Sequence, residues 1–144
     1  MKVYFIIKIG DAMKRRIQDI DVTNKKVLVR CDFNVPIING EILDDSKILA
    51  SLNTINYLIK EKAKIIILSH FGKVKNEKDK ENNSLAPIAA HLQKLVNTKV
   101  IFSRQPRNLY LESKIEQMNP GEIIILENTR FEDFPEKYES ASDE

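Results

Sequence analysis

The chain has 144 residues, of which 42% are hydrophobic and 31% are charged, and its formal net charge is +2. A chain of this length buries one core and is short for two domains. The weak charge, spread along the chain, lacks the basic footprint of nucleic-acid binding, so we expect no nucleic-acid partner. The single cysteine, Cys31, excludes an internal disulfide and fits a reducing, cytoplasmic setting. We expect Cys31 to be a small buried side chain rather than a nucleophile.

The first twelve residues are interpreted as an extension of unknown status. Their apolar run is broken by Lys8 and followed by Asp11, so they lack the features of a signal peptide and are too short to span a membrane. Met13 is an alternative start, and residues 13–144 have the pattern of a globular domain. We therefore expect no membrane partner.

From Val27 onward, short apolar runs alternate with amphipathic ones. A β-rich run covers residues 27–32, and Asn39-Gly40 predicts the turn of a small hairpin. Ser46 is the expected cap of a helix whose apolar residues recur at helical spacing. The continuous run 64–69 is typical of a strand covered on both faces.

The second half of the chain repeats this alternation. Residues 72–83 are charged and predict a loop, after which Ser84 is expected to start a helix that tolerates Pro87 in its first turn. On that helix His91 is expected to face solvent. Further strands are predicted at 99–102 and 122–126, with a helix at about 109–118 between them. After Arg130 the apolar pattern is lost, which indicates an exposed loop or the start of a helix.

Strands that alternate with helices predict a parallel sheet with right-handed crossovers, and hence a Rossmann-like three-layer α/β domain. The last segment stops without completing the pattern, so we expect the domain to be truncated. The carboxyl ends of parallel strands share one edge, where ligands bind. Polar and cationic side chains that follow the predicted strands are therefore the candidate site: Asp32, Asn34, His70, Lys73 and Arg130.

The chemistry of these side chains favours an anion. Arg130 and Lys73 supply fixed charge, His70 supplies a titratable donor, and Asp32 with Asn34 can bond hydroxyl groups. A small phosphorylated hydroxy acid satisfies all of them. The four glycines form neither a Walker-A loop nor a dinucleotide-binding GxGxxG motif, and we predict no metal site.

Each of these residues also has a structural explanation. Backbone groups can satisfy a strand-end histidine such as His70, and Lys73 belongs to a lysine-rich segment typical of a solvated loop. Asp32 and Asn34 before Pro36 suit ordinary turn chemistry. Arg130 can form an ion pair with a nearby glutamate.

Five segments of the chain form recognisable motifs: Val27-Leu-Val-Arg-Cys-Asp-Phe-Asn-Val-Pro36, Leu43-Asp-Asp-Ser-Lys-Ile48, Ser69-His-Phe-Gly-Lys73, Ser84-Leu-Ala-Pro87 and Leu126-Glu-Asn-Thr-Arg-Phe131. In this order they resemble the phosphoglycerate kinase family. The resemblance runs from about Arg16 to the last residues. It covers only the N-terminal part of a two-domain enzyme, so residues 13–144 would be an incomplete N-terminal, substrate-binding domain.

The resemblance implies reversible phosphoryl transfer from 1,3-bisphosphoglycerate to ADP with Mg²⁺, giving 3-phosphoglycerate and ATP in glycolysis. In that family the N-terminal domain holds the glycerate and the C-terminal domain holds the nucleotide. We therefore expect 3-phosphoglycerate as the small-molecule partner, and the C-terminal part of the enzyme as a second partner. We expect no nucleotide to bind to this chain alone, which would then be inactive.

The resemblance also implies roles for individual residues. Asp32 and Asn34 would contact the glycerate, with Phe33 shaping the pocket between them. The phosphate would be bound by His70, Lys73 and Arg130, on a loop set by Phe71 and Gly72. Lys47 would be the catalytic cation beside the transferring phosphoryl group.

This sequence departs from the family at two cations. Lys47 and Lys73 both stand where the family commonly has arginine. Lysine keeps the charge but lacks the planar fork that binds two oxygens at once. If the lost fork costs ~1.4 kcal/mol in the transition state, the rate falls roughly tenfold. The alternatives to an enzyme are a non-catalytic module that binds 3-phosphoglycerate or a similar anion, and a decayed fragment.

Overall fold

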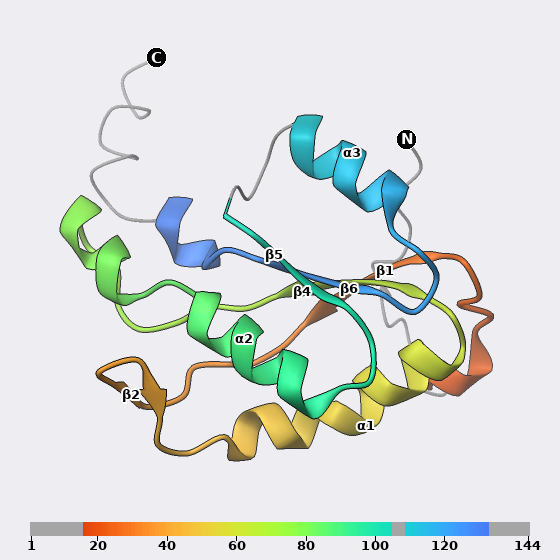
Figure 1. Ribbon diagram of the computed structural model, residues 1–144, viewed down its shortest axis with the longest axis horizontal. Helices are drawn as coiled ribbons and strands as arrows, with labels where there is room; N and C mark the ends of the chain where they lie inside the picture. Colours follow the sequence, from red (N-terminus) through yellow and green to blue (C-terminus); the bar gives the residue numbers. More distant parts are fainter. Residues whose placement is uncertain (1–15, 105–108, 133–144) are drawn as a thin grey trace, which may run out of the picture.

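A computed structural model describes residues 16–104 and 109–132; the extension expected over residues 1–12 lies outside them. In this part of the chain, four strands form one parallel sheet in the order β1-β4-β6-β5 (Figure 1). The strands are β1 (Lys26–Arg30), β4 (Lys64–Leu68), β5 (Val100–Ser103) and β6 (Ile123–Leu126). The predicted hairpin is confirmed: β2 (Ile37–Ile38) pairs with β3 (Glu41–Ile42), and Asn39 and Gly40 have positive φ in its turn.

Helices cover both faces of the sheet. Helices α1 (Ser46–Lys60) and α2 (Ala86–Leu95) lie on one face and α3 (Leu109–Gln117) on the other (Figure 1). Successive residues of the central strand β4 enter opposite cores, Ile65 with α1 and α2, and Ile66 with α3. Burial on both faces explains why this run is continuously apolar. The predicted Rossmann-like three-layer architecture is therefore confirmed.

Two helix starts differ from those expected. Ser46 does not cap α1 but is its first residue, and its N–H donates to the Asp44 carboxylate at 2.9 Å. Helix α2 begins at Ala86 rather than Ser84. Its start is held by Glu127, whose carboxylate accepts the Leu85 N–H at 2.8 Å. A cap from a residue 42 positions away leaves no local signal in the sequence.

Other boundaries shift slightly. Strand β1 ends at Arg30, two residues before the expected end. The predicted loop over residues 72–83 contains a 3-10 helix, Glu77–Asn82, whose start is capped by the Asn76 side chain. A short 3-10 helix, Thr129–Glu132, follows β6, and the rest of the expected terminal loop lies outside the described residues. None of the helices in the described ranges has the length and apolar character needed to cross a membrane.

Strand β1 forms one edge of the described sheet. Lys25 and Cys31 bond to β4 through their backbones. Because residues alternate along a parallel strand, the backbone groups of Lys26, Leu28 and Arg30 face away from β4. Leu28 is paired in register with Ile66, on the α3 face, yet 49% of it is exposed. An edge with an exposed apolar residue favours pairing with another strand.

We predict marginal stability or edge-to-edge association of this chain. A lysine on an edge strand opposes pairing, so Leu28→Lys should lower self-association in sedimentation velocity. Leu49→Lys is the matched control, since Leu49 is 45% exposed on α1, away from the edge. A monomeric wild-type chain at all concentrations, with a sharp calorimetric transition, would contradict this prediction.

Candidate binding site at the strand ends

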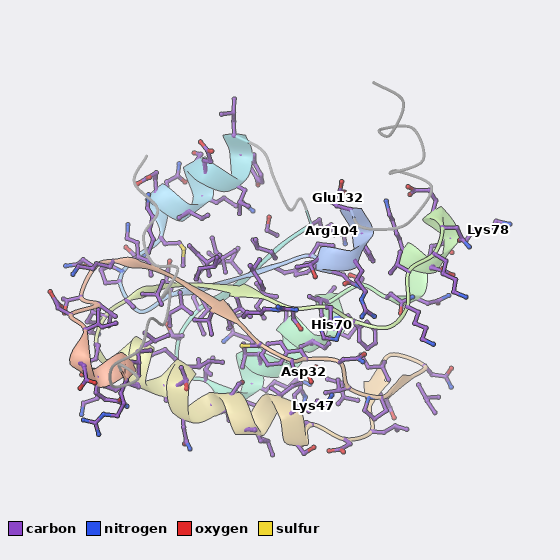
Figure 2. All side chains as sticks on the ribbon, turned by 180° about the vertical axis from the view of Figure 1, so that it is seen from behind. Asp32, Lys47, His70, Lys78, Arg104 and Glu132 are labelled. Carbon is purple, nitrogen blue, oxygen red and sulfur yellow. The ribbon has the colours of Figure 1, made fainter. Side chains whose placement is uncertain are left out.

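The three motifs that follow β1, β4 and β6 meet at one edge of the sheet. These strands are parallel neighbours, so their carboxyl ends lie side by side. Figure 2 shows Asp32, Lys47 and His70 together there, where β1 and β4 end and α1 begins. The topology thus brings side chains that are far apart in sequence to one edge, as predicted.

Asp32 and Lys47 form the best-defined ion pair of this edge. Lys47 Nζ lies 2.9 Å from Asp32 Oδ2, and both side chains are about half exposed. The lysine comes from the first turn of α1 and the aspartate directly follows β1. The Asp32 carboxylate accepts hydrogen bonds from Lys47 and from the Asn34 N–H, and these bonds lower its pKa. His70 Nε2 is 4.0 Å from Asp32 Oδ1 and adds a smaller effect.

Asn34 connects the β1 loop to the β4 loop. Its Oδ1 accepts the Gly72 N–H at 3.0 Å, while its own N–H donates to Asp32 Oδ1 at 3.2 Å. The turn chemistry considered for these residues is therefore present at Asp32, whereas the Asn34 side chain bonds to a distant loop instead of to local backbone. These bonds leave the Asn34 Nδ2 group and part of the Asp32 carboxylate as polar groups on the exposed side of the loop.

The two phenylalanines among the candidate residues lie inward. Phe33 is fully buried and Phe71 is 8% exposed, and both belong to the core beneath the loops. The Phe33 N–H donates to Ser69 Oγ at 2.9 Å. These side chains anchor the loops from below, so any contact with a ligand falls to their backbones and neighbours.

Arg130 reaches the β4 loop from the end of β6. Its guanidinium donates to the Gly72 carbonyl, beside exposed Lys73. Glu127, one of the glutamates considered as its partner, instead caps α2 and accepts bonds from Ser84 and Leu85. The edge thus carries Arg130 after β6, and His70 and Lys73 in the loop after β4.

Three polar residues at this edge are buried, which was not predicted from the sequence. Ser69, Glu127 and Asn128 are at most 6% exposed, and each lies within two residues of the end of a buried strand. The available signal was their position, because a polar residue that continues an apolar run must find partners inside the fold. Arg104, which was also missed, follows β5 at the same edge (Figure 2).

A hollow of about 400 Å³ separates the end of β1 from the first turns of α1. Asp32 and Lys47 line it together with small side chains of α1, and Cys31 lies at its wall. Burial raises the pKa of the Cys31 thiol to about 11, so it stays protonated at neutral pH, in agreement with its expected structural role. Within the described ranges, no three His, Cys, Asp or Glu side chains gather as metal ligands.

Fold and site together define a Rossmann-like domain with a cationic site at its strand ends. A family model described as phosphoglycerate kinase matches residues 17–144. A phosphoglycerate kinase of Listeria innocua serovar 6a is 47% identical over 130 residues, covering 90% of this chain and 33% of that protein. The chain belongs to the phosphoglycerate kinase family, and it spans about one third of the length of such curated relatives.

Solved structures agree with this assignment. The phosphoglycerate kinase from Pyrococcus horikoshii OT3 superposes with a TM-score of 0.69 at 34% identity, covering 81% of this chain and 28% of that one. The phosphoglycerate kinase from Coxiella burnetii gives a TM-score of 0.66 at 36% identity, covering 80% and 28% of the two chains.

The charge pairing of Asp32 gives a pH prediction. A carboxyl whose pKa is lowered by folding stabilises the fold at neutral pH, and this contribution is lost as the pH falls through the lowered value. Removing the cation with Lys47→Met should raise the pKa of Asp32 toward its ordinary value, as followed by the ¹³C shift of its carboxyl group. Lys75→Met, which removes a charge elsewhere, should not. An unchanged Asp32 titration in Lys47→Met would contradict the pairing.

Proposed function

We propose that this chain is the incomplete substrate-binding domain of a phosphoglycerate kinase and holds 3-phosphoglycerate at the strand-end edge. The observation that carries the proposal is the bond from the Arg130 guanidinium to the Gly72 carbonyl. It places the cation of one loop against the loop that bears His70 and Lys73, which concentrates positive charge where a phosphate would sit.

Different residues bind the phosphate and the glycerate ends of the ligand. His70, Lys73 and Arg130 bind its phosphate, with Phe71 and Gly72 setting the loop that presents them. Asp32 and Asn34 contact the glycerate through its hydroxyl group, above the buried Phe33. The hydrogen bond from the Gly72 N–H to Asn34 Oδ1 joins the loops after β1 and β4, so the residues for both ends of the ligand are fixed relative to one another.

Lys47 is the proposed catalytic cation. Its ammonium is bound to Asp32, and both side chains line the hollow between β1 and α1. During transfer it neutralises charge on the moving phosphoryl group, the main task of a protein in such reactions. Lysine does so without the two-point contact of arginine, and therefore less strongly.

Turnover needs groups from the rest of the enzyme. The described loops carry no glycine-rich cradle for a nucleotide, so ADP or ATP with Mg²⁺ is expected on the C-terminal part of a complete enzyme. Closure of the two parts then brings the phosphoryl donor and acceptor together. This chain alone would bind its substrate in the cytoplasm without catalysis; a non-catalytic anion-binding module would differ only in lacking a completing partner.

Binding can be measured directly. Titration of the ¹⁵N-labelled chain with 3-phosphoglycerate should give saturable amide shifts in residues 69–73 and at Arg130. Each of Arg130→Ala and His70→Ala should weaken affinity by roughly tenfold or more, since a charge-assisted hydrogen bond contributes about 1.5–3 kcal/mol. Lys94→Ala removes an exposed charge at the end of α2 and serves as control. No saturable shift, or equal affinity in all variants, would contradict the proposal.

A further inference from the structure

Asn128 is a fully buried amide whose hydrogen-bonding capacity is completely used. Its Oδ1 accepts the N–H groups of Phe71 and Arg130, both at 3.1 Å. Its Nδ2 donates to the carbonyls of Phe71 at 2.6 Å and Asn83 at 2.8 Å. Two acceptor and two donor positions are all that an asparagine side chain offers. The bonds also fix which atom of the amide is oxygen.

These bonds hold both partners of the contact between Arg130 and the β4 loop. Phe71 stands between His70 and Gly72 in the β4 loop, and Asn128 bonds to its N–H and its carbonyl. Arg130, whose guanidinium reaches Gly72, has its backbone N–H fixed by the same oxygen. The arginine and the loop that it meets are therefore placed relative to one buried side chain.

The third residue bonded to the Asn128 side chain, Asn83, packs against the β4 loop at Gly72. Gly72 has φ +58, and a Cβ at this position would lie 1.7 Å from Asn83 Oδ1. The loop therefore packs directly against Asn83, whose carbonyl is held by Asn128. Packing this close leaves the loop little freedom to adjust when a neighbour moves.

We propose that Asn128 is a positioning residue for the phosphate site: it fixes the spacing of Arg130, His70 and Lys73 from below without touching the ligand. This inference rests on the proposed function, since it concerns affinity at the same site. A preorganised set of cations binds an anion without the cost of ordering its loops on binding. Loss of Asn128 would release both loops and leave four backbone groups without their partner, among them the buried N–H and carbonyl of Phe71.

A double-mutant cycle separates positioning from general destabilisation. Affinity for 3-phosphoglycerate is measured by calorimetry for wild type, Asn128→Ala, Arg130→Ala and the double variant. We expect Asn128→Ala to weaken binding by roughly tenfold, and Arg130→Ala to cost clearly less in the Asn128→Ala background than in wild type. Thr98→Val is the control: it removes a bond of 2.9 Å to the Gly121 carbonyl at the opposite end of the sheet, and should lower stability without changing affinity.

Hydrogen exchange tests the same idea in the wild-type chain, even if Asn128→Ala fails to fold. Saturating 3-phosphoglycerate should slow exchange of the Phe71 and Arg130 amides by roughly tenfold, because a ligand that binds the held arrangement also stabilises it. The Ala89 amide of α2, which donates to the carbonyl of the N-cap residue Leu85, should not change. Wild-type affinity in Asn128→Ala, additive losses, or unchanged exchange of Phe71 and Arg130 would overturn the inference. A wild-type chain that does not bind 3-phosphoglycerate would instead overturn the proposed function and this inference with it.

Discussion

The central strands of this fold end inside the protein, and their polar backbones must still be satisfied there. Beyond Leu68 and Leu126 the sheet ladder runs out while the chain stays buried, as the 1% exposure of Ser69 and 0% of Asn128 show. Unpaired buried N–H and C=O groups are costly, so side chains take over from the ladder. Ser69, Glu127 and Asn128 do so, and no buried side-chain polar atom in the described ranges lacks a partner.

The same requirement shapes the candidate site above. Ser69 Oγ accepts the Phe33 N–H, which ties the β1 loop to β4. Glu127 caps α2, and Asn128 joins the loops after β4 and β6. The exposed residues of these loops, Asp32, Lys73 and Arg130, and the partly buried His70 thus stand on a layer of buried hydrogen bonds. Buried hydrogen bonds that fix the positions of these loops would preorganise the proposed anion site.

The sequence was sufficient for the sheet, since β4 and β6 are unbroken runs of β-branched residues and their periodicity differs plainly from that of α1 and α2. It was also sufficient to place Asp32, His70 and Arg130 at one edge, because parallel topology fixes where strand ends lie. It missed contacts between residues that are far apart in the sequence. Glu127 as the cap of α2 and the ion pair of His91 with Asp45, at 2.9 Å, join residues more than 40 positions apart. His91, expected to face solvent, is half-buried for that reason.

The proposed phosphate site is supported by both the family assignment and the local chemistry, and the ligand can be observed there directly. A crystal structure of the chain grown with 3-phosphoglycerate tests the central claim. We predict density for the phosphate within hydrogen-bonding distance of His70, Lys73 and Arg130, with the glycerate end at Asp32 and Asn34 and the buried bonds of Asn128 intact. Density at another surface, or a filled site in which these three cations do not contact the phosphate, would contradict the claim.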